Sequence, residues 1–133
     1  SYKSPYNFSF NLNKIDSKNE KTLFCLADCY RIQEKYKDAI ELFLQALEIN
    51  PKNLLVLHNT AVSYKYLNNN EKAIEYYKKV LDLNSGFVRA LRNLAEIYIE
   101  EGNTEKACNL LSTALEKHPD SQEIKELHAK ICS

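Results

Sequence analysis

The side chains that could carry out catalysis or hold a metal in this sequence are three histidines and four cysteines. They are His58, His118, His128, Cys25, Cys29, Cys108 and Cys132. None of the histidines has a serine, cysteine or carboxylate partner in a recognisable nucleophile–base arrangement. The cysteines form no C-x2-C pair and no Cys/His cluster at zinc-ligand spacing. The sequence therefore predicts no enzyme, cofactor or metal site, and we interpret all four cysteines as reduced thiols that behave as small hydrophobic residues.

Two asparagines and two arginines offer binding chemistry instead. Asn59 and Asn93 are 34 residues apart, and an amide can both donate to and accept from a peptide backbone. Arg89 and Arg92 could form bidentate pairs with a carboxylate. The alternative for the arginines is a solvated face on which nearby glutamates balance their charge. These residue types indicate peptide recognition if the chain brings them onto one surface.

A 34-residue repeat determines where these residues lie. Shifting the sequence by 34 positions aligns Leu23, Leu57 and Leu91; Ala27, Ala61 and Ala95; Tyr30, Tyr64 and Tyr98; and Ala39, Ala73 and Ala107. Nothing is inserted between copies, so the repeats occupy residues 20–53, 54–87 and 88–121. Within a copy, Leu57, Ala61 and Tyr64 recur at helical spacing, and a second apolar stripe follows around Ala73. Each copy is predicted to be a helical hairpin in which the small alanine lets two helices approach closely.

The first copy resembles the tetratricopeptide repeat signature, L-x2-L-A-x2-Y…A-x3-F…P. The matching residues are Leu23, Leu26, Ala27, Tyr30, Ala39, Phe43 and Pro51. The resemblance covers residues 20–121, with leucine in place of the usual tryptophan, Thr60 in place of a large apolar residue and Ser85 in place of the proline between repeats. It implies an all-α, right-handed α-solenoid of three antiparallel helix pairs.

The resemblance also implies that the first helix of each pair lines a concave groove. The corresponding residues are Lys21, Phe24, Cys25 and Asp28 in the first repeat; Leu55, His58, Asn59 and Val62 in the second; and Arg89, Arg92, Asn93 and Glu96 in the third. We expect His58 to contact solvent. The predicted ligand is a peptide segment whose apolar part lies near Phe24, Leu55 and Val62, with an acidic or polar part near the arginines.

One alternative is a co-chaperone domain that binds acidic C-terminal chaperone tails through a carboxylate clamp of lysine, asparagine and arginine. By resemblance, Asn59 matches an asparagine of the clamp, and Arg89 stands at a lysine position. Phe24 and Asp28 occupy the first lysine and first asparagine positions. Because Asp28 would repel a carboxylate, we expect such binding to be weak or absent.

The two ends of the chain lie outside the three repeats. Residues 1–16 do not continue the pattern, because Pro5 falls where a helix would need alanine. They are either a flexible tail or an ordered segment against the repeats. A Ser17/Glu20 capping box predicts that the first helix starts near Lys18. A second box, Asp120/Glu123, predicts a capping helix over residues 122–133.

Composition narrows the choice of partners. The 18 Lys and Arg residues balance the 18 Asp and Glu residues, so we expect neither nucleic acid nor a membrane as partner. No run of about 20 apolar residues is present, and we expect an intracellular protein, cytoplasmic or nuclear. The predicted function is a non-enzymatic protein–protein interaction scaffold within a larger protein or complex. The alternatives are a self-associating structural unit whose groove is filled by residues 1–16, and an accessory domain of an enzyme.

Overall fold

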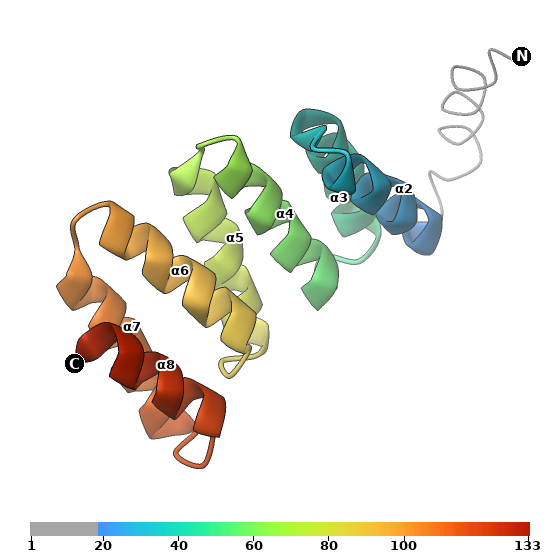
Figure 1. Cartoon of the computed structure of the whole chain (residues 1–133). Helices are drawn as coiled ribbons and strands as arrows, with labels where there is room; N and C mark the ends of the chain where they lie inside the picture. Colours follow the sequence, from blue (N-terminus) through green and yellow to red (C-terminus); the bar gives the residue numbers. More distant parts are fainter. Residues whose placement is uncertain (1–18) are drawn as a thin grey trace, which may run out of the picture. The chain divides into compact units, whose positions relative to one another are not determined.

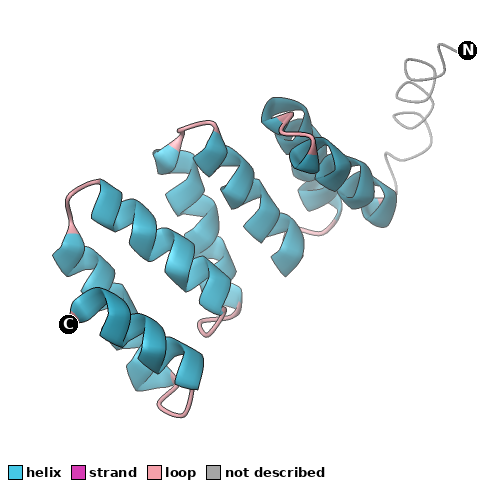
Figure 2. Ribbon diagram, viewed as in Figure 1, coloured by secondary structure: helices cyan, strands magenta, loops and turns pink. Residues whose placement is uncertain are grey.

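A computed structural model describes residues 19–133, which form seven α-helices and no strand (Figures 1 and 2). The predictions for residues 1–16 and for Ser17 lie outside the described residues. The helices are α2 (Glu20–Ile32), α3 (Tyr36–Ile49), α4 (Leu54–Tyr66), α5 (Asn70–Leu83), α6 (Val88–Glu100), α7 (Thr104–Lys117) and α8 (Gln122–Cys132). Helices α2, α4, α6 and α8 begin 34 residues apart, and so do α3, α5 and α7. The prediction of an all-α fold is confirmed.

The chain divides into two compact units, with the boundary between Asn69 and Asn70. In the N-terminal unit, α3 packs against both α2 and α4, and α2 also touches α4. In the C-terminal unit, each helix from α5 to α8 packs against the next, and α6 also touches α8. Each unit therefore buries its own set of apolar side chains.

The residues that repeat every 34 positions form the core. The alanines are fully buried at all six positions: Ala27, Ala61, Ala95, Ala39, Ala73 and Ala107. The repeated leucines, Leu23, Leu57 and Leu91, are at most 2% exposed. In the N-terminal unit, Tyr30 packs against a buried cluster that contains Ala27, Ala39 and Phe43. Small residues therefore lie where helix backbones come closest, and larger side chains fill the space beside them.

The turns between first and second helices have the same backbone geometry in all three copies. Glu34, Asn68 and Gly102 adopt positive φ angles of 64°, 62° and 80°. The next backbone N–H along the chain donates to the carbonyl of Tyr30, Tyr64 or Tyr98, at 2.8, 2.9 and 2.8 Å respectively. This left-handed position ends each first helix, and glycine is the residue that adopts it without steric cost.

The N-terminal caps of the first helices also follow the 34-residue period. The side chains of Asn19, Asn53 and Ser121 each accept a hydrogen bond from the backbone N–H three residues further along. Phe87, at the same position of the third copy, makes no side-chain cap. The predicted start of the first helix near Lys18 was two residues too early, because α2 begins at Glu20. The predicted Asp120/Glu123 capping box was one residue away from the observed cap, Ser121. A cap must directly precede the first helical turn, and Asn19 and Ser121 hold that place.

The interpretation of all four cysteines as reduced thiols was wrong for one pair. Cys108 on α7 and Cys132 on α8 form a disulfide, with their Cα atoms 5.6 Å apart. They are 24 residues apart in sequence, but α8 folds back against α7 and brings the sulfurs together. Cys25 and Cys29 are free thiols and are exposed.

Candidate functional site

The N-terminal unit carries eight of the predicted groove residues on α2 and α4. Lys21, Cys25 and Leu55 are exposed, and Phe24, Asp28, Asn59 and Val62 are half-buried. His58 is only 4% exposed, so the expectation that it contacts solvent was wrong. Helix α4 buries Val56, Leu57, Thr60, Ala61 and Ser63 as well, and a helix buried around most of its circumference leaves little exposed surface for His58.

Three of these residues line one pocket of about 300 Å³ in the N-terminal unit. Lys21, Phe24 and Leu55 form its wall together with Glu20, Asn50 and Asn53. The Phe24 ring packs against Phe43 with the ring centres 6.1 Å apart, which holds the aromatic side chain in place. Asn53 Nδ2 donates a hydrogen bond to a Glu20 carboxylate oxygen. The pocket therefore combines apolar side chains with a polar rim of fixed geometry.

A polar contact joins two further candidates of the N-terminal unit. Asn59 Nδ2 donates to Asp28 Oδ1 at 3.0 Å, and Arg31 Nε donates to the same oxygen at 2.7 Å. The Asp28 charge is therefore balanced by Arg31. The side-chain carbonyl oxygen of Asn59 remains an acceptor for a ligand N–H.

In the C-terminal unit, the candidate residues of α6 are joined by residues of α8 that sequence reasoning missed. Arg89, Arg92 and Glu96 are exposed, and Asn93 is half-buried. Arg92 lines a pocket of about 220 Å³ with Glu123, Glu126, Leu127 and Lys130. Those four α8 residues lie 34 positions after Arg89, Arg92, Asn93 and Glu96. Extending the repeat by one copy would have identified them.

The charges around the two arginines differ. Arg92 shares its pocket with the carboxylates of Glu123 and Glu126, which reduces its attraction for an acidic ligand. The Arg89 guanidinium carbon lies 5.1 Å from the centre of the Phe87 ring. A guanidinium held over an aromatic ring is ordered in advance and keeps its N–H donors for a carboxylate.

The structure places two serines beside histidines, which the sequence did not predict. Ser85 Oγ lies 2.8 Å from His118 Nε2, and Ser112 Oγ lies 3.1 Å from His128 Nε2. Within residues 19–133, no carboxylate bonds to either ring, so neither pair has the third group that orients a catalytic base. The first pair instead links the α5–α6 loop to the C-terminal end of α7.

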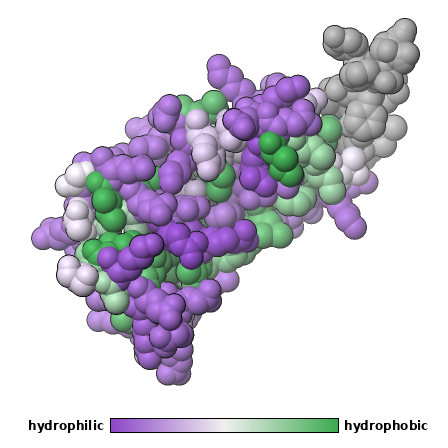
Figure 3. Space-filling model, in the orientation of Figure 1, coloured by the Kyte–Doolittle hydropathy of each residue, from purple (hydrophilic) through white to green (hydrophobic). Residues whose placement is uncertain are grey.

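The rest of the described surface offers few other kinds of site. In the part of the chain that the structure covers, no three His, Cys, Asp or Glu residues lie together as a metal site would require. No described helix has the length and apolar character needed to span a membrane. The face shown in Figure 3 is mostly hydrophilic, with apolar side chains in small groups.

Comparison with known families identifies the repeat. Two family models, both described as tetratricopeptide repeat, match residues 20–85 and 66–131. Together they cover residues 20–131, which include all seven helices except the last residue of α8. A search of curated proteins found no significant match.

Solved structures share the fold, an all-α helical repeat solenoid. The crystal structure of MamA is 23% identical with a TM-score of 0.73, over 78% of this chain and 61% of that one. A tetratricopeptide repeat protein from Parabacteroides merdae is 29% identical with a TM-score of 0.72, over 85% of this chain and 44% of that one. The first TPR of Spaghetti (RPAP3), bound to the HSP90 peptide SRMEEVD, is 23% identical with a TM-score of 0.69, over 87% and 92%. This chain thus spans less than two thirds of the first two.

Proposed function

The chain belongs to the tetratricopeptide repeat family, whose fold is a protein–protein interaction module, and we propose that it binds a peptide segment of a partner without catalysing a reaction. The observation that carries this proposal is the pocket formed by Lys21, Phe24 and Leu55 on the N-terminal unit. A partner's apolar side chain enters this pocket and contacts Phe24 and Leu55. The Lys21 ammonium group stays in water at the rim.

The polar groups next to the pocket suit a peptide backbone. Asn59 presents its side-chain carbonyl oxygen, because one of its two amide N–H groups bonds to Asp28 and holds the amide in place. A backbone N–H of the ligand supplies the missing donor. The N-terminal unit thus recognises one apolar side chain and one backbone amide, a combination that requires no particular neighbouring sequence.

The C-terminal unit supplies a separate charged contact. We assign it to Arg89, because this guanidinium is exposed and ordered over Phe87, whereas Arg92 lies beside two carboxylates. A ligand carboxylate binds Arg89 through charge-assisted hydrogen bonds. The ligand that reaches Arg89 therefore carries at least one carboxylate.

A matched pair of leucine variants tests the proposal. Peptides are selected against the whole chain from a displayed random library, and their affinities are measured by fluorescence anisotropy. Leu55→Ser removes an apolar wall of the pocket, whereas Leu83→Ser alters a leucine outside it; the two side chains are 47% and 43% exposed. We expect Leu55→Ser to weaken binding about fivefold or more, as partial loss of a leucine contact implies, and Leu83→Ser to leave it unchanged.

Two outcomes would contradict the proposal. One is equal weakening by both leucine variants, and the other is the absence of any selected peptide. Deleting residues 1–16 separates the remaining alternative. In that alternative, the exposed repeat ends drive self-association, so the whole chain forms oligomers in sedimentation and its groove binds no peptide until residues 1–16 are removed. If a partner fills the groove, peptide binding is present in the whole chain and persists or becomes tighter after the deletion.

A further inference from the structure

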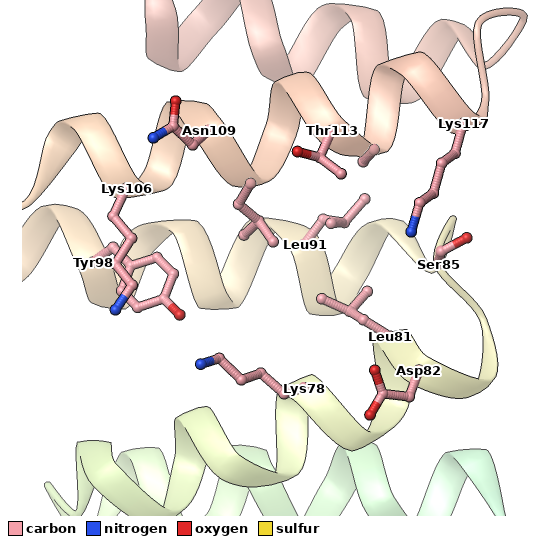
Figure 4. A pocket seen from close by; sticks show the side chains of 12 residues that line it. Lys78, Leu81, Asp82, Ser85, Leu91, Tyr98, Lys106, Asn109, Thr113 and Lys117 are labelled. Atoms are coloured by element: carbon pink, nitrogen blue, oxygen red, sulfur yellow. The ribbon is translucent and has the colours of Figure 1, made fainter.

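A second pocket lies in the C-terminal unit, on a different side of α6 from Arg92. It has a volume of about 370 Å³ and is formed by α5, α6, α7 and the α5–α6 loop that contains Ser85 (Figure 4). Leu81, Leu91 and Leu110 supply apolar surface from three helices. Pockets of this size hold a large side chain or a small ligand.

The surroundings of this second pocket are positively charged. Lys78, Lys106 and Lys117 line it, against the single carboxylate of Asp82. Figure 4 shows the ammonium groups of Lys78 and Lys106 directed towards Tyr98, and Lys106 Nζ lies 4.9 Å from the centre of that ring. Across the described part of the chain, none of these three lysines forms an ion pair with a carboxylate. Their charges are therefore available to a ligand.

The repeat itself does not require lysine at two of these positions. In the other copies, the position of Lys78 holds Leu44 and Ser112. The position of Lys117 holds Ile49 and Leu83. A helix pair of this family therefore folds with neutral residues at both places, so the fold does not require Lys78 and Lys117 to be charged.

We propose that this pocket is a second binding site, for an acidic peptide segment of a partner protein that carries a bulky apolar side chain. The apolar side chain lies on Leu81, Leu91 and Leu110, and flanking carboxylates pair with the lysines. Nucleic acid fits less well, because Lys106 covers a face of the Tyr98 ring on which a base would stack. This site is independent of the face that carries Phe24 and Leu55.

The test uses peptides of defined chemistry and the whole chain. The probe is a short capped peptide in which leucines alternate with pairs of glutamates. One control peptide has lysines for the glutamates, and another has serines for the leucines. Nuclear magnetic resonance shifts of the backbone amides locate the site. We expect the first peptide alone to shift amides around Lys78, Tyr98 and Lys117, and its binding to weaken as salt increases.

Variants that copy the other repeats test the lysines without disturbing the fold. The double variant Lys78→Ser/Lys117→Leu should bind the acidic peptide roughly tenfold more weakly, since two ion pairs are lost. Lys125→Ser, at an exposed lysine of α8 outside the pocket, should leave affinity unchanged. The proposal is overturned if the acidic peptide does not bind, if its shifts map to Arg89 and Arg92, or if both variants behave alike. Stronger binding of a single-stranded oligonucleotide than of the peptide would overturn the choice of ligand.

Discussion

Asn59 on α4 and Asp28 on α2 are joined by a hydrogen bond of 3.0 Å from the amide nitrogen to the carboxylate. This contact uses one of the two amide N–H donors of Asn59, the residue that by resemblance would match an asparagine of a chaperone-tail clamp. It also places the Asp28 carboxylate beside the Asn59 amide, so that an acceptor stands next to the group a clamp would offer to a ligand. The same contact links α2 to α4 in the N-terminal unit. It therefore fixes the position of the side-chain amide oxygen of Asn59.

The first prediction concerns acidic C-terminal tails. A pentapeptide that ends in two acidic residues and a free carboxylate should show no low-micromolar site in isothermal titration, because Asp28 is an acceptor where the clamp needs a donor and already takes one amide N–H of Asn59. Asp28→Asn should strengthen any residual binding. Tight binding to the unchanged chain that disappears when the peptide's C-terminus is amidated would restore the clamp interpretation.

The second prediction concerns the missing cap of α6. Phe87→Asn should raise the free energy of unfolding by up to about 1 kcal/mol, because asparagine at this position caps α2 and α4 through its side chain. Urea unfolding measures the change. Asn53→Ala is the reverse experiment and should cost about 1 kcal/mol or more, since it also removes the bond to Glu20. A loss of stability in Phe87→Asn would mean that the contact between Phe87 and Arg89 outweighs the cap.

The sequence predicted the helices and their core well, because the 34-residue period and the helical spacing are local signals. A small residue is needed where two helices cross closely, so the repeated Ala39, Ala73 and Ala107 could be predicted to be buried. The disulfide between Cys108 and Cys132 could not be predicted this way, since it depends on how α8 returns to α7. The same holds for Asp28 and Asn59, which lie 31 residues apart and meet only when α2 and α4 pack together.

The third prediction concerns the left-handed turn position. Gly102→Ala should lower the free energy of unfolding by about 1 kcal/mol, because φ is +80° there and a β-carbon disfavours this region. No atom lies within 4 Å of the added β-carbon, so a steric clash does not contribute. Glu34→Gly, at the same position of the first copy, should be neutral or slightly stabilising. If Gly102→Ala is also neutral in urea unfolding, backbone conformation is not what selects glycine at this turn.

The fourth prediction concerns the covalent link between α7 and α8. Reduction of the Cys108–Cys132 disulfide should lower the free energy of unfolding by about 3 kcal/mol, the value expected for closing a loop of this length. Thermal unfolding with and without reductant measures it. The Cys25→Ala/Cys29→Ala variant should remain sensitive to reductant, and Cys108→Ala/Cys132→Ala should not. Equal midpoints for the unchanged chain under both conditions would show that the bond does not stabilise the fold.

The last prediction follows from the burial of Tyr98, which is 4% exposed. Burial raises the pKa of this phenol above its usual value of 10.0, and the nearby Glu101 carboxylate raises it further. The folded chain therefore keeps the proton to a higher pH than the unfolded chain. The resulting stabilisation is fully present below about pH 10 and is lost as the pH rises through the pKa of the folded state.

Tyr98→Phe removes this linkage while it keeps the ring. Between about pH 9 and pH 11, the free energy of unfolding of the variant should fall less steeply than that of the unchanged chain. Urea unfolding at each pH, referred to the value of the same protein at pH 7, measures the slope independently of any constant effect of the lost hydroxyl. Ultraviolet titration of the folded variant should show one fewer phenol with a raised pKa. Parallel slopes for the two proteins would mean that Tyr98 ionises in the folded chain as readily as in the unfolded one, and that its hydroxyl reaches water despite the buried ring.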